Sequence, residues 1–371
     1  MSAPVPQPVS EPASAAFRHD LHAAPVAAAE RAKRLIDPGF GRVFTDHMAV
    51  IRYSDQAGWH DAHITARAPL PIDPASSVLH YAQEIFEGMK AYRLADGGTA
   101  LFRPEANAAR FRDSARRMAM AELPEALFVE SIERLVAADR DWIPEGDGAL
   151  YLRPFMIASE VFLGVKPSAE YLYMVIASSV GAYWKGGVRA ITVWVSRDHT
   201  RAALGGTGAA KCGGNYAASL IAQKQAIAHG CDQVVFLDAV ERRWVEELGG
   251  MNLFFVFADG SLQTPPLTGT ILPGITRDSL LTLARDMGLA VREEPYAIDQ
   301  WRADSQSGRL AEAFACGTAA VVTPIGRIAD RDGDFTMGDG MGGPVTDRLH
   351  QALVAIQRGT APDPHGWLHR L

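Results

Sequence analysis

The sequence predicts a mixed α/β protein (α+β) of two domains, and three observations support that prediction. The chain has 371 residues, which exceeds the size at which a single hydrophobic core stops growing. From Val43 onward, short runs rich in β-forming residues alternate with helical patterns. Between the two halves, aromatic residues stand among glycines at 181–187, which indicates a domain junction.

The expected first domain, small and α/β, covers residues 31–180. It follows a flexible arm at residues 1–30 that is rich in Ala, Pro and Ser. Two of its expected helices have clear start signals, because Pro104 and Pro124 suit the beginning of a helix. The expected strands are 44–53, 149–155 and 171–179, and the expected helices are 104–122 and 127–139.

The expected second domain, the larger one, covers residues 190–371 and follows an interdomain loop at 181–189. It opens with a strand at 190–196 and contains a buried strand at 233–237. Its three expected helices each end near a glycine, the residue that most readily terminates a helix. These helices are 215–229, 275–287 and 346–358, and the glycines are Gly230, Gly288 and Gly359.

The composition excludes several classes of function. The net charge is -7 and the chain has no basic stripe, so no nucleic-acid partner is expected. No apolar run approaches the roughly 18 to 20 residues that span a bilayer, so no membrane partner is expected. The three cysteines have no metal-type spacing, which predicts no metal site and indicates reduced thiols in the cytoplasm.

The segment 205–216 places one lysine, Lys211, among very small residues. Small neighbours leave room for a bulky ligand, and glycines let the backbone approach a planar cofactor closely. A partly desolvated lysine amine is neutral and nucleophilic. A flexible loop with an exposed lysine fits this segment equally well. A phosphate loop does not, because Ala210 and Cys212 stand where that motif requires Gly and Ser or Thr.

Three further segments offer polar groups to a ligand. Glu247 ends an expected strand, where a carboxylate can pair with the ring nitrogen of a pyridoxal cofactor. The run 268–277 leads into a helix whose free N–H groups, together with Thr276, suit a phosphate. The run 316–320 adds the hydroxyl of Thr318 and more N–H groups. Taken singly, the first of these segments is better explained by an ordinary turn and the second by an ordinary helix start, and the third is only a weak signal.

Taken in order, these segments resemble the class IV aminotransferases, the group that includes the D-amino-acid and branched-chain types. The sequence matches the family signature at Glu247, Asn252, Thr264, Gly274 and Arg277. Within that class the chain is similar to the bacterial branched-chain aminotransferases from Phe40 to about Gln357. The runs that carry this similarity are 44–48, 79–81, 86–92, 101–104, 181–183 and 213–216.

The resemblance implies a fold-type-IV homodimer that binds pyridoxal 5′-phosphate between its two domains. The implied reaction is a reversible ping-pong transfer of the amino group from L-leucine, L-isoleucine or L-valine to 2-oxoglutarate, giving branched 2-oxo acids and L-glutamate. A D-amino-acid aminotransferase or an aminodeoxychorismate lyase remains an alternative, although the runs 86–92 and 151–154 are not expected in either. A non-catalytic protein that has kept the fold is a further alternative, but it would be expected to lack Lys211 or Glu247.

The resemblance also implies a role for individual residues. Lys211 would be the catalytic Schiff-base lysine, Glu247 the partner of the pyridine nitrogen, and Tyr216 the donor to the phenolic oxygen of the ring. The other implied cofactor contacts are Arg103, Ile275, Thr276 and Thr318 at the phosphate, and Arg201. The implied substrate contacts, some of them across the dimer interface, are Phe44, Tyr81, Phe86, Tyr151, Arg153, Tyr183, Gly250 and Ala319.

Two departures from the animal members of the family affect these expectations. Gly250 stands where those members have a Thr that helps to bind the substrate carboxylate, so backbone N–H groups near Gly250 and Ala319 are expected to bind it instead. Ala320 and Thr323 stand where those members carry a Cys-x-x-Cys redox pair. No thiol switch of that kind is therefore expected.

Overall fold

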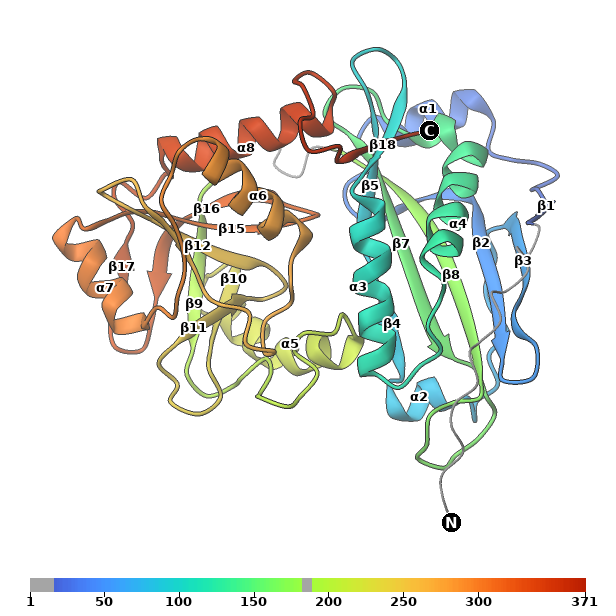
Figure 1. Ribbon diagram of the computed structural model, residues 1–371, viewed down its shortest axis with the longest axis horizontal. Coiled ribbons are helices and arrows are strands. Elements are labelled where there is room, and N and C mark those ends of the chain that lie inside the picture. Colours follow the sequence, from blue (N-terminus) through green and yellow to red (C-terminus); the bar gives the residue numbers. More distant parts are fainter. Residues whose placement is uncertain (1–16, 182–188) are drawn as a thin grey trace.

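Two β-sheets with helices packed against them form the molecule. The computed structural model describes residues 17–181 and 189–371, and within those ranges each sheet has nine strands (Figure 1). Figure 1 shows the first sheet on the right beside α3 and α4, and the second sheet on the left. The predicted mixed α/β fold class is confirmed. In the described part of the chain, no helix is long and apolar enough to cross a membrane.

The first sheet is built mainly from the first half of the chain. Its order is β1-β3-β2-β8-β7-β5-β6-β18, with β4 paired to β7. The strands are β1 (Arg18–Asp20), β2 (Val43–Ser54), β3 (Gly58–Ala66), β4 (Glu84–Phe86), β5 (Met89–Arg93), β6 (Thr99–Phe102), β7 (Ala149–Ala158), β8 (Glu170–Val180) and β18 (Leu368–Arg370). The helices of this half are α1 (Ala28–Leu35), α2 (Ser77–Tyr81), α3 (Pro104–Arg117) and α4 (Glu125–Ala138), followed by the 3-10 turn η1 (Arg140–Trp142).

The second sheet mixes parallel and antiparallel pairs. Its order is β11-β10-β9-β16-β15-β12-β13-β14, with β17 paired to β16. The strands are β9 (Ile191–Ser196), β10 (Gln233–Leu237), β11 (Val245–Leu248), β12 (Asn252–Phe257), β13 (Leu262–Thr264), β14 (Val291–Glu293), β15 (Leu310–Gly317), β16 (Val321–Ala329) and β17 (Phe335–Thr336). The helices are α5 (Gly213–Ala228), α6 (Ile275–Asp286), α7 (Ile298–Ser307) and α8 (Pro344–Gln357).

The predicted strands and helices are all present, and one of them ends earlier than predicted. Helix α3 begins at Pro104 as expected but stops at Arg117. Ala119 takes a φ of 52°, and the N–H of Met120 donates to the carbonyl of Ala115 at 2.9 Å. This hydrogen bond belongs to a helix-ending motif that usually has Gly in the left-handed position. Because Ala occupies that position here, the sequence carried no signal for the end of the helix.

The segment before β2 differs from the prediction of a flexible arm at residues 1–30. Residues 18–20 pair with β3 as strand β1, and α1 begins within the predicted arm. The side chains of Asp46 and His47 accept hydrogen bonds from the N–H groups of Val26 and His22. The prediction is therefore wrong for residues 17–30, because β2 and β3 hold that segment in place. Residues 1–16 lie outside the described part of the chain.

The end of the chain also departs from the predicted domain boundary. Strand β18 pairs with β6, and Figure 1 shows the chain returning from α8 to the first sheet. Residues 368–370 therefore belong with the first sheet, although they were expected in the domain at 190–371. A boundary at 181–189 remains a prediction.

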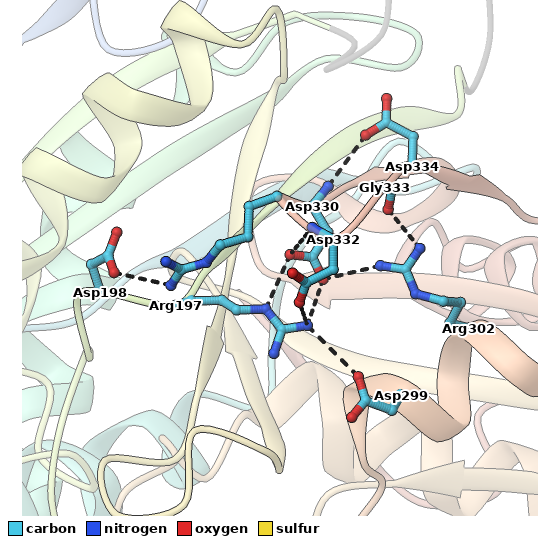
Figure 2. Close-up of polar contacts among 9 residues, drawn as sticks. Arg197, Asp198, Asp299, Arg302, Asp330, Asp332, Gly333 and Asp334 are labelled. Atoms are coloured by element: carbon cyan, nitrogen blue, oxygen red, sulfur yellow. Dashed lines mark hydrogen bonds and ion pairs between the residues drawn. The ribbon is translucent and has the colours of Figure 1, made fainter.

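A buried ion-pair network ties together one end of the second sheet. The fully buried side chain of Asp330, just after β16, pairs with Arg197 at 2.7 Å and with Arg302 of α7 at 3.2 Å. Figure 2 shows Arg197 reaching Asp299 and Asp332 as well. A buried carboxylate is costly without partners, so the two arginines make Asp330 a link between β9, β16 and α7.

Candidate active site

A cavity of about 260 Å³ collects residues from both halves of the molecule. Strands β4 and β7 contribute Phe86, Tyr151 and Arg153. Lys211 lies just before α5, and Tyr216 lies in its first turn. The other lining residues are Phe40, Gly88, Arg110, Gln233, Gly250, Met251, Asn252, Leu272, Gly274, Ile275, Thr276, Cys316, Gly317, Thr318, Ala319 and Ala320. A second cavity of about 350 Å³ is lined mostly by apolar residues and by no lysine, arginine or histidine. Of these two cavities, only the smaller one is therefore lined by a lysine and by arginines.

The backbone of Lys211 is fixed while its amine faces the cavity. Its N–H donates to Ser114 Oγ at 3.0 Å, and its carbonyl accepts from the N–H of Phe86 at 3.0 Å. The Nζ atom donates to Tyr216 Oη at 2.8 Å and lies 4.7 Å from the centre of the Phe86 ring. In the described part of the chain, no carboxylate pairs with this amine. Lys211 is therefore held in place with its amine available to a ligand.

Glycines allow the backbone to close around this cavity. A Cβ atom on Gly88 would collide with the hydroxyl of Tyr151, and one on Gly274 would collide with the amide oxygen of Asn252. A side chain at Gly250 would press on the ring of Tyr216 at 3.2 Å. These positions leave the space in front of Lys211 to a flat ligand.

Glu247, on β11, does not line the cavity but is hydrogen-bonded to a residue that does. Its Oε2 accepts from the N–H of Leu272, a lining residue, at 3.3 Å. The same oxygen pairs with Arg201 Nη1 at 3.0 Å. Burial raises the pKa of Glu247 to about 7, because desolvation outweighs the nearby Arg201 charge. Arg201 also donates to the carbonyl of Thr270, so it lies behind the wall with Glu247 and not in the cavity.

The other end of the cavity is suited to an anion. Ile275 and Thr276 open helix α6, where N–H groups lack intrahelical acceptors, and Thr318 lies in the same lining. Arg110 of α3 is the arginine at this end. Glu87 orients it through two hydrogen bonds of 2.7 and 2.8 Å.

The structure does not bring Arg103 to the cavity. Its guanidinium donates to Ser279 Oγ at 2.7 Å and pairs with Asp278 at 2.7 Å, both on α6. Arg103, expected as a phosphate contact, is not among the residues that line the cavity, whereas Arg110, which was not predicted, is. The sequence could have indicated Arg110, because it follows Asn107 by three residues and so lies on the same buried face of α3.

The predicted substrate residues divide into three groups. Lining the cavity are Phe86, Tyr151, Arg153, Gly250 and Ala319. Phe44 and Tyr81 do not line it: the Arg67 guanidinium covers the Phe44 ring at 4.3 Å, and the exposed Tyr81 donates to the carbonyl of Leu163. Tyr183 lies outside the described residues. Phe40, which was not predicted, packs edge-on against Tyr151 with ring centres 5.0 Å apart.

Comparison with known proteins agrees with this geometry. Residues 84–328 match the model of the family described as amino-transferase class IV. The chain is 57% identical to a probable branched-chain-amino-acid aminotransferase of Streptomyces coelicolor over 94% of this chain and 96% of that protein. It is 56% identical to the branched-chain-amino-acid aminotransferase of Mycolicibacterium smegmatis, again over 94% and 96% of the two chains.

Solved structures agree as well. The branched-chain amino acid aminotransferase of Escherichia coli superposes with a TM-score of 0.72 at 30% identity, over 87% of this chain and 98% of that chain. The T.th. branched-chain amino acid aminotransferase complexed with N-(5′-phosphopyridoxyl)-L-glutamate gives 0.71 at 32% identity, over 86% and 98%. The cofactor is accordingly pyridoxal 5′-phosphate. The chain therefore belongs to the class IV aminotransferase family and, within it, to the branched-chain-amino-acid aminotransferases.

Proposed function

We propose that the chain transfers the amino group reversibly between L-leucine, L-isoleucine or L-valine and 2-oxoglutarate, in a ping-pong cycle that forms L-glutamate. The observation that carries this choice is the mixed lining around Lys211. Phe40, Phe86 and Met251 offer apolar surface to a branched side chain, and Arg153 offers one positive charge to the second carboxylate of glutamate.

The residues around the cavity fit pyridoxal 5′-phosphate. Gly88 and Gly274 leave space for a flat ring, and Tyr216 can donate to its phenolic oxygen. At the anion end, Arg110 takes the place that we had expected for Arg103. We assign the phosphate to Arg110, to Thr318 and to the N–H groups of Ile275 and Thr276. When bound, the cofactor supplies an electron sink that makes the Cα proton of an amino acid removable.

Three side chains perform the proton chemistry in this proposal. Lys211 would hold the cofactor covalently, and its Nζ, when free, would act as the general base that accepts the Cα proton of the substrate and returns it. Glu247, whose carboxylate lies behind the cavity wall at the N–H of Leu272, would hold the proton on the ring nitrogen of the cofactor. Arg201 favours the charged form of that carboxylate, because its positive charge opposes in part the effect of burial on the pKa of Glu247.

We also propose that the chain works as a cytoplasmic homodimer. Exposed apolar side chains gather on α2 and on the loop after β7, where the Tyr81 hydroxyl bonds the carbonyl of Leu163. These exposed residues are Leu79, Tyr81, Val161, Phe162, Leu163 and Val165. A partner surface would cover them, as exposed apolar patches usually require. Tyr81 could then contact the substrate of the other subunit.

One set of assays tests the proposed function. The purified holoenzyme should convert leucine, isoleucine and valine with 2-oxoglutarate, and it should leave D-alanine unchanged. Lys211→Ala should fold but lose the visible absorption of bound cofactor and essentially all turnover. The exposed-lysine variant Lys33→Met is the matched control and should behave like the parent. Turnover of D-alanine in place of leucine would refute the substrate assignment, and turnover by Lys211→Ala would refute the role of the lysine.

A further inference from the structure

Lys90 of β5 is a buried lysine whose only side-chain hydrogen bond, within the described residues, crosses from the first half of the molecule to the second. It is 8% exposed, and its Nζ donates to the carbonyl of Ala319 at 3.0 Å. No carboxylate of the described residues pairs with it. A lysine ammonium has three donors and is costly to bury without a counter-ion, so packing alone does not explain this residue.

The partner carbonyl belongs to a tight turn that lines the cavity. Strands β15 and β16 are paired up to Gly317 and Val321, so the turn between them has three residues, 318–320. Val321 follows with a φ of 60°, a left-handed conformation that glycine usually supplies in such turns. A β-branched residue is strained there, so the turn needs contacts that hold it.

The hydrogen bond from Lys90 sets the direction of one peptide group. In a trans peptide the C=O and the following N–H point in opposite directions. With the carbonyl of Ala319 held by Lys90, the N–H of Ala320 points away from Lys90. The N–H groups of Ala319 and Ala320 donate to no acceptor among the described residues, and both residues line the cavity.

The charge of Lys90 reinforces this arrangement. Burial, together with the positive charge of the nearby Arg358 guanidinium, lowers the pKa of Lys90 to about 8, so the side chain is still mostly cationic at neutral pH. A positive charge directly behind the turn makes the turn's N–H groups better donors to an anion. Arg358 itself donates to the carbonyl of Asp147.

We propose that Lys90 is a positioning residue that reaches across from the first sheet to hold the turn at 318–320, so that the turn's free N–H groups bind the α-carboxylate of the substrate. The inference rests on the proposed function and on the carboxylate contact that the resemblance implies near Ala319, and what it adds is the role of Lys90. Lys90 does not line the cavity and acts through Ala319.

The test separates carboxylate binding from general damage. Lys90→Met removes the charge and the donor with little change in volume, whereas Lys90→Arg keeps both. In the half-reaction with leucine, Lys90→Met should lower the second-order rate constant about ten-fold or more. With 3-methylbutylamine, which is leucine without its carboxylate, the rate should change less than about two-fold. Lys90→Arg should restore most of the leucine rate.

A second measurement avoids turnover. 4-Methylvalerate is leucine without its amino group, and its affinity can be followed by the absorption of the bound cofactor. Lys90→Met should weaken its binding about ten-fold while cofactor content stays that of the parent. The exposed-lysine variant Lys33→Met should change neither measurement.

Each other outcome has a defined meaning. Equal losses with leucine and with the amine, or unchanged 4-methylvalerate binding, would overturn the inference and leave Lys90 as a packing residue. If Lys90→Met does not fold, Lys90→Gln replaces it under the same criteria. If the parent does not use leucine, the proposed function fails first. An active parent with unaffected Lys90 variants contradicts only the inference.

Discussion

Arg153→Gln should separate the two substrates that the proposed cycle needs. In the structure, Arg153 Nη2 donates to Tyr151 Oη at 3.0 Å, and its guanidinium lies 4.8 Å from the centre of the Phe86 ring. It donates to no backbone carbonyl and pairs with no carboxylate in the described part of the chain. Its Nε atom is buried without a partner. The charge of Arg153 is therefore available to the second carboxylate of glutamate.

The expected size of the effect follows from that hydrogen bond. A charge-assisted bond contributes roughly 1.5 to 3 kcal/mol, which corresponds to about a 10- to 150-fold change in rate. Leucine has no second carboxylate, and its side chain gains roughly 1.5 to 3 kcal/mol from burial against apolar surface. Gln at position 153 removes the guanidinium over Phe86 but keeps an uncharged polar side chain. The glutamate reaction should therefore slow at least ten-fold while the leucine reaction changes little.

The assay measures the two half-reactions separately, because steady-state ping-pong rates mix them. Single-turnover absorption changes of the holoenzyme with glutamate or with leucine give each second-order rate constant. Arg153→Lys is the matched control: it keeps the charge but loses the planar fork, so its glutamate rate should fall between those of the parent and Arg153→Gln. Equal losses with both substrates would refute the reasoning and make Arg153 a structural residue.

Three further predictions concern groups outside the substrate pocket. Burial raises the pKa of Glu247 to about 7, so between pH 4.5 and 7 the folded cofactor-free protein keeps a proton that the unfolded chain has lost. The free energy of unfolding should therefore fall as the pH rises from 4.5 to 7. Glu247→Gln should remove this dependence when the thermal-unfolding midpoint is measured against pH. Asp330→Asn should destabilise the fold by about 3 to 5 kcal/mol in denaturant unfolding, since it breaks a buried ion-pair network; a loss below about 1 kcal/mol would contradict that role. Peroxide followed by thiol reductant should not switch activity reversibly, because all three cysteines, Cys212, Cys231 and Cys316, are free and buried; a switch abolished by Cys212→Ser would overturn this prediction.

The sequence predicted most elements of the fold because their signals are local. Pro104 marks the start of α3, and Gly230 and Gly288 end α5 and α6 with φ values of 70° and 76°. The errors are long-range. The pairing of β18 with β6 joins residues that are far apart in the chain, and no local pattern announces it. The N-terminal segment was expected to be flexible because its composition is polar and small, yet Asp46 holds it through Val26.

The site shows the same division between local and long-range information. Lys211 was recognised from its neighbours in the chain, and it does line the cavity. Neighbouring residues in the chain do not show whether Arg103 or Arg110 reaches the cavity. Both are arginines, one immediately before α3 and the other within it. Their difference is rotational: Arg110 lies on the face of α3 that meets Glu87, whereas Arg103 precedes the helix and reaches α6. A helical projection of buried polar residues would have favoured Arg110.

The signature residues explain why the sequence reveals the family but not most of the residues that line the substrate pocket. Thr264 donates to the carbonyl of Leu253 at 2.7 Å, and Asn252 donates to the carbonyl of Leu272 at 3.0 Å. Arg277 donates to the carbonyl of Pro265 at 3.0 Å. These bonds join β12 and β13 to the segment that leads into α6, so they fix the anion end of the cavity relative to Glu247. This set of hydrogen bonds needs particular side chains at fixed spacing within one stretch of chain, and a sequence pattern can describe such spacing. The substrate pocket instead takes single residues such as Phe40 and Arg153 from separate elements, and only the fold brings these together.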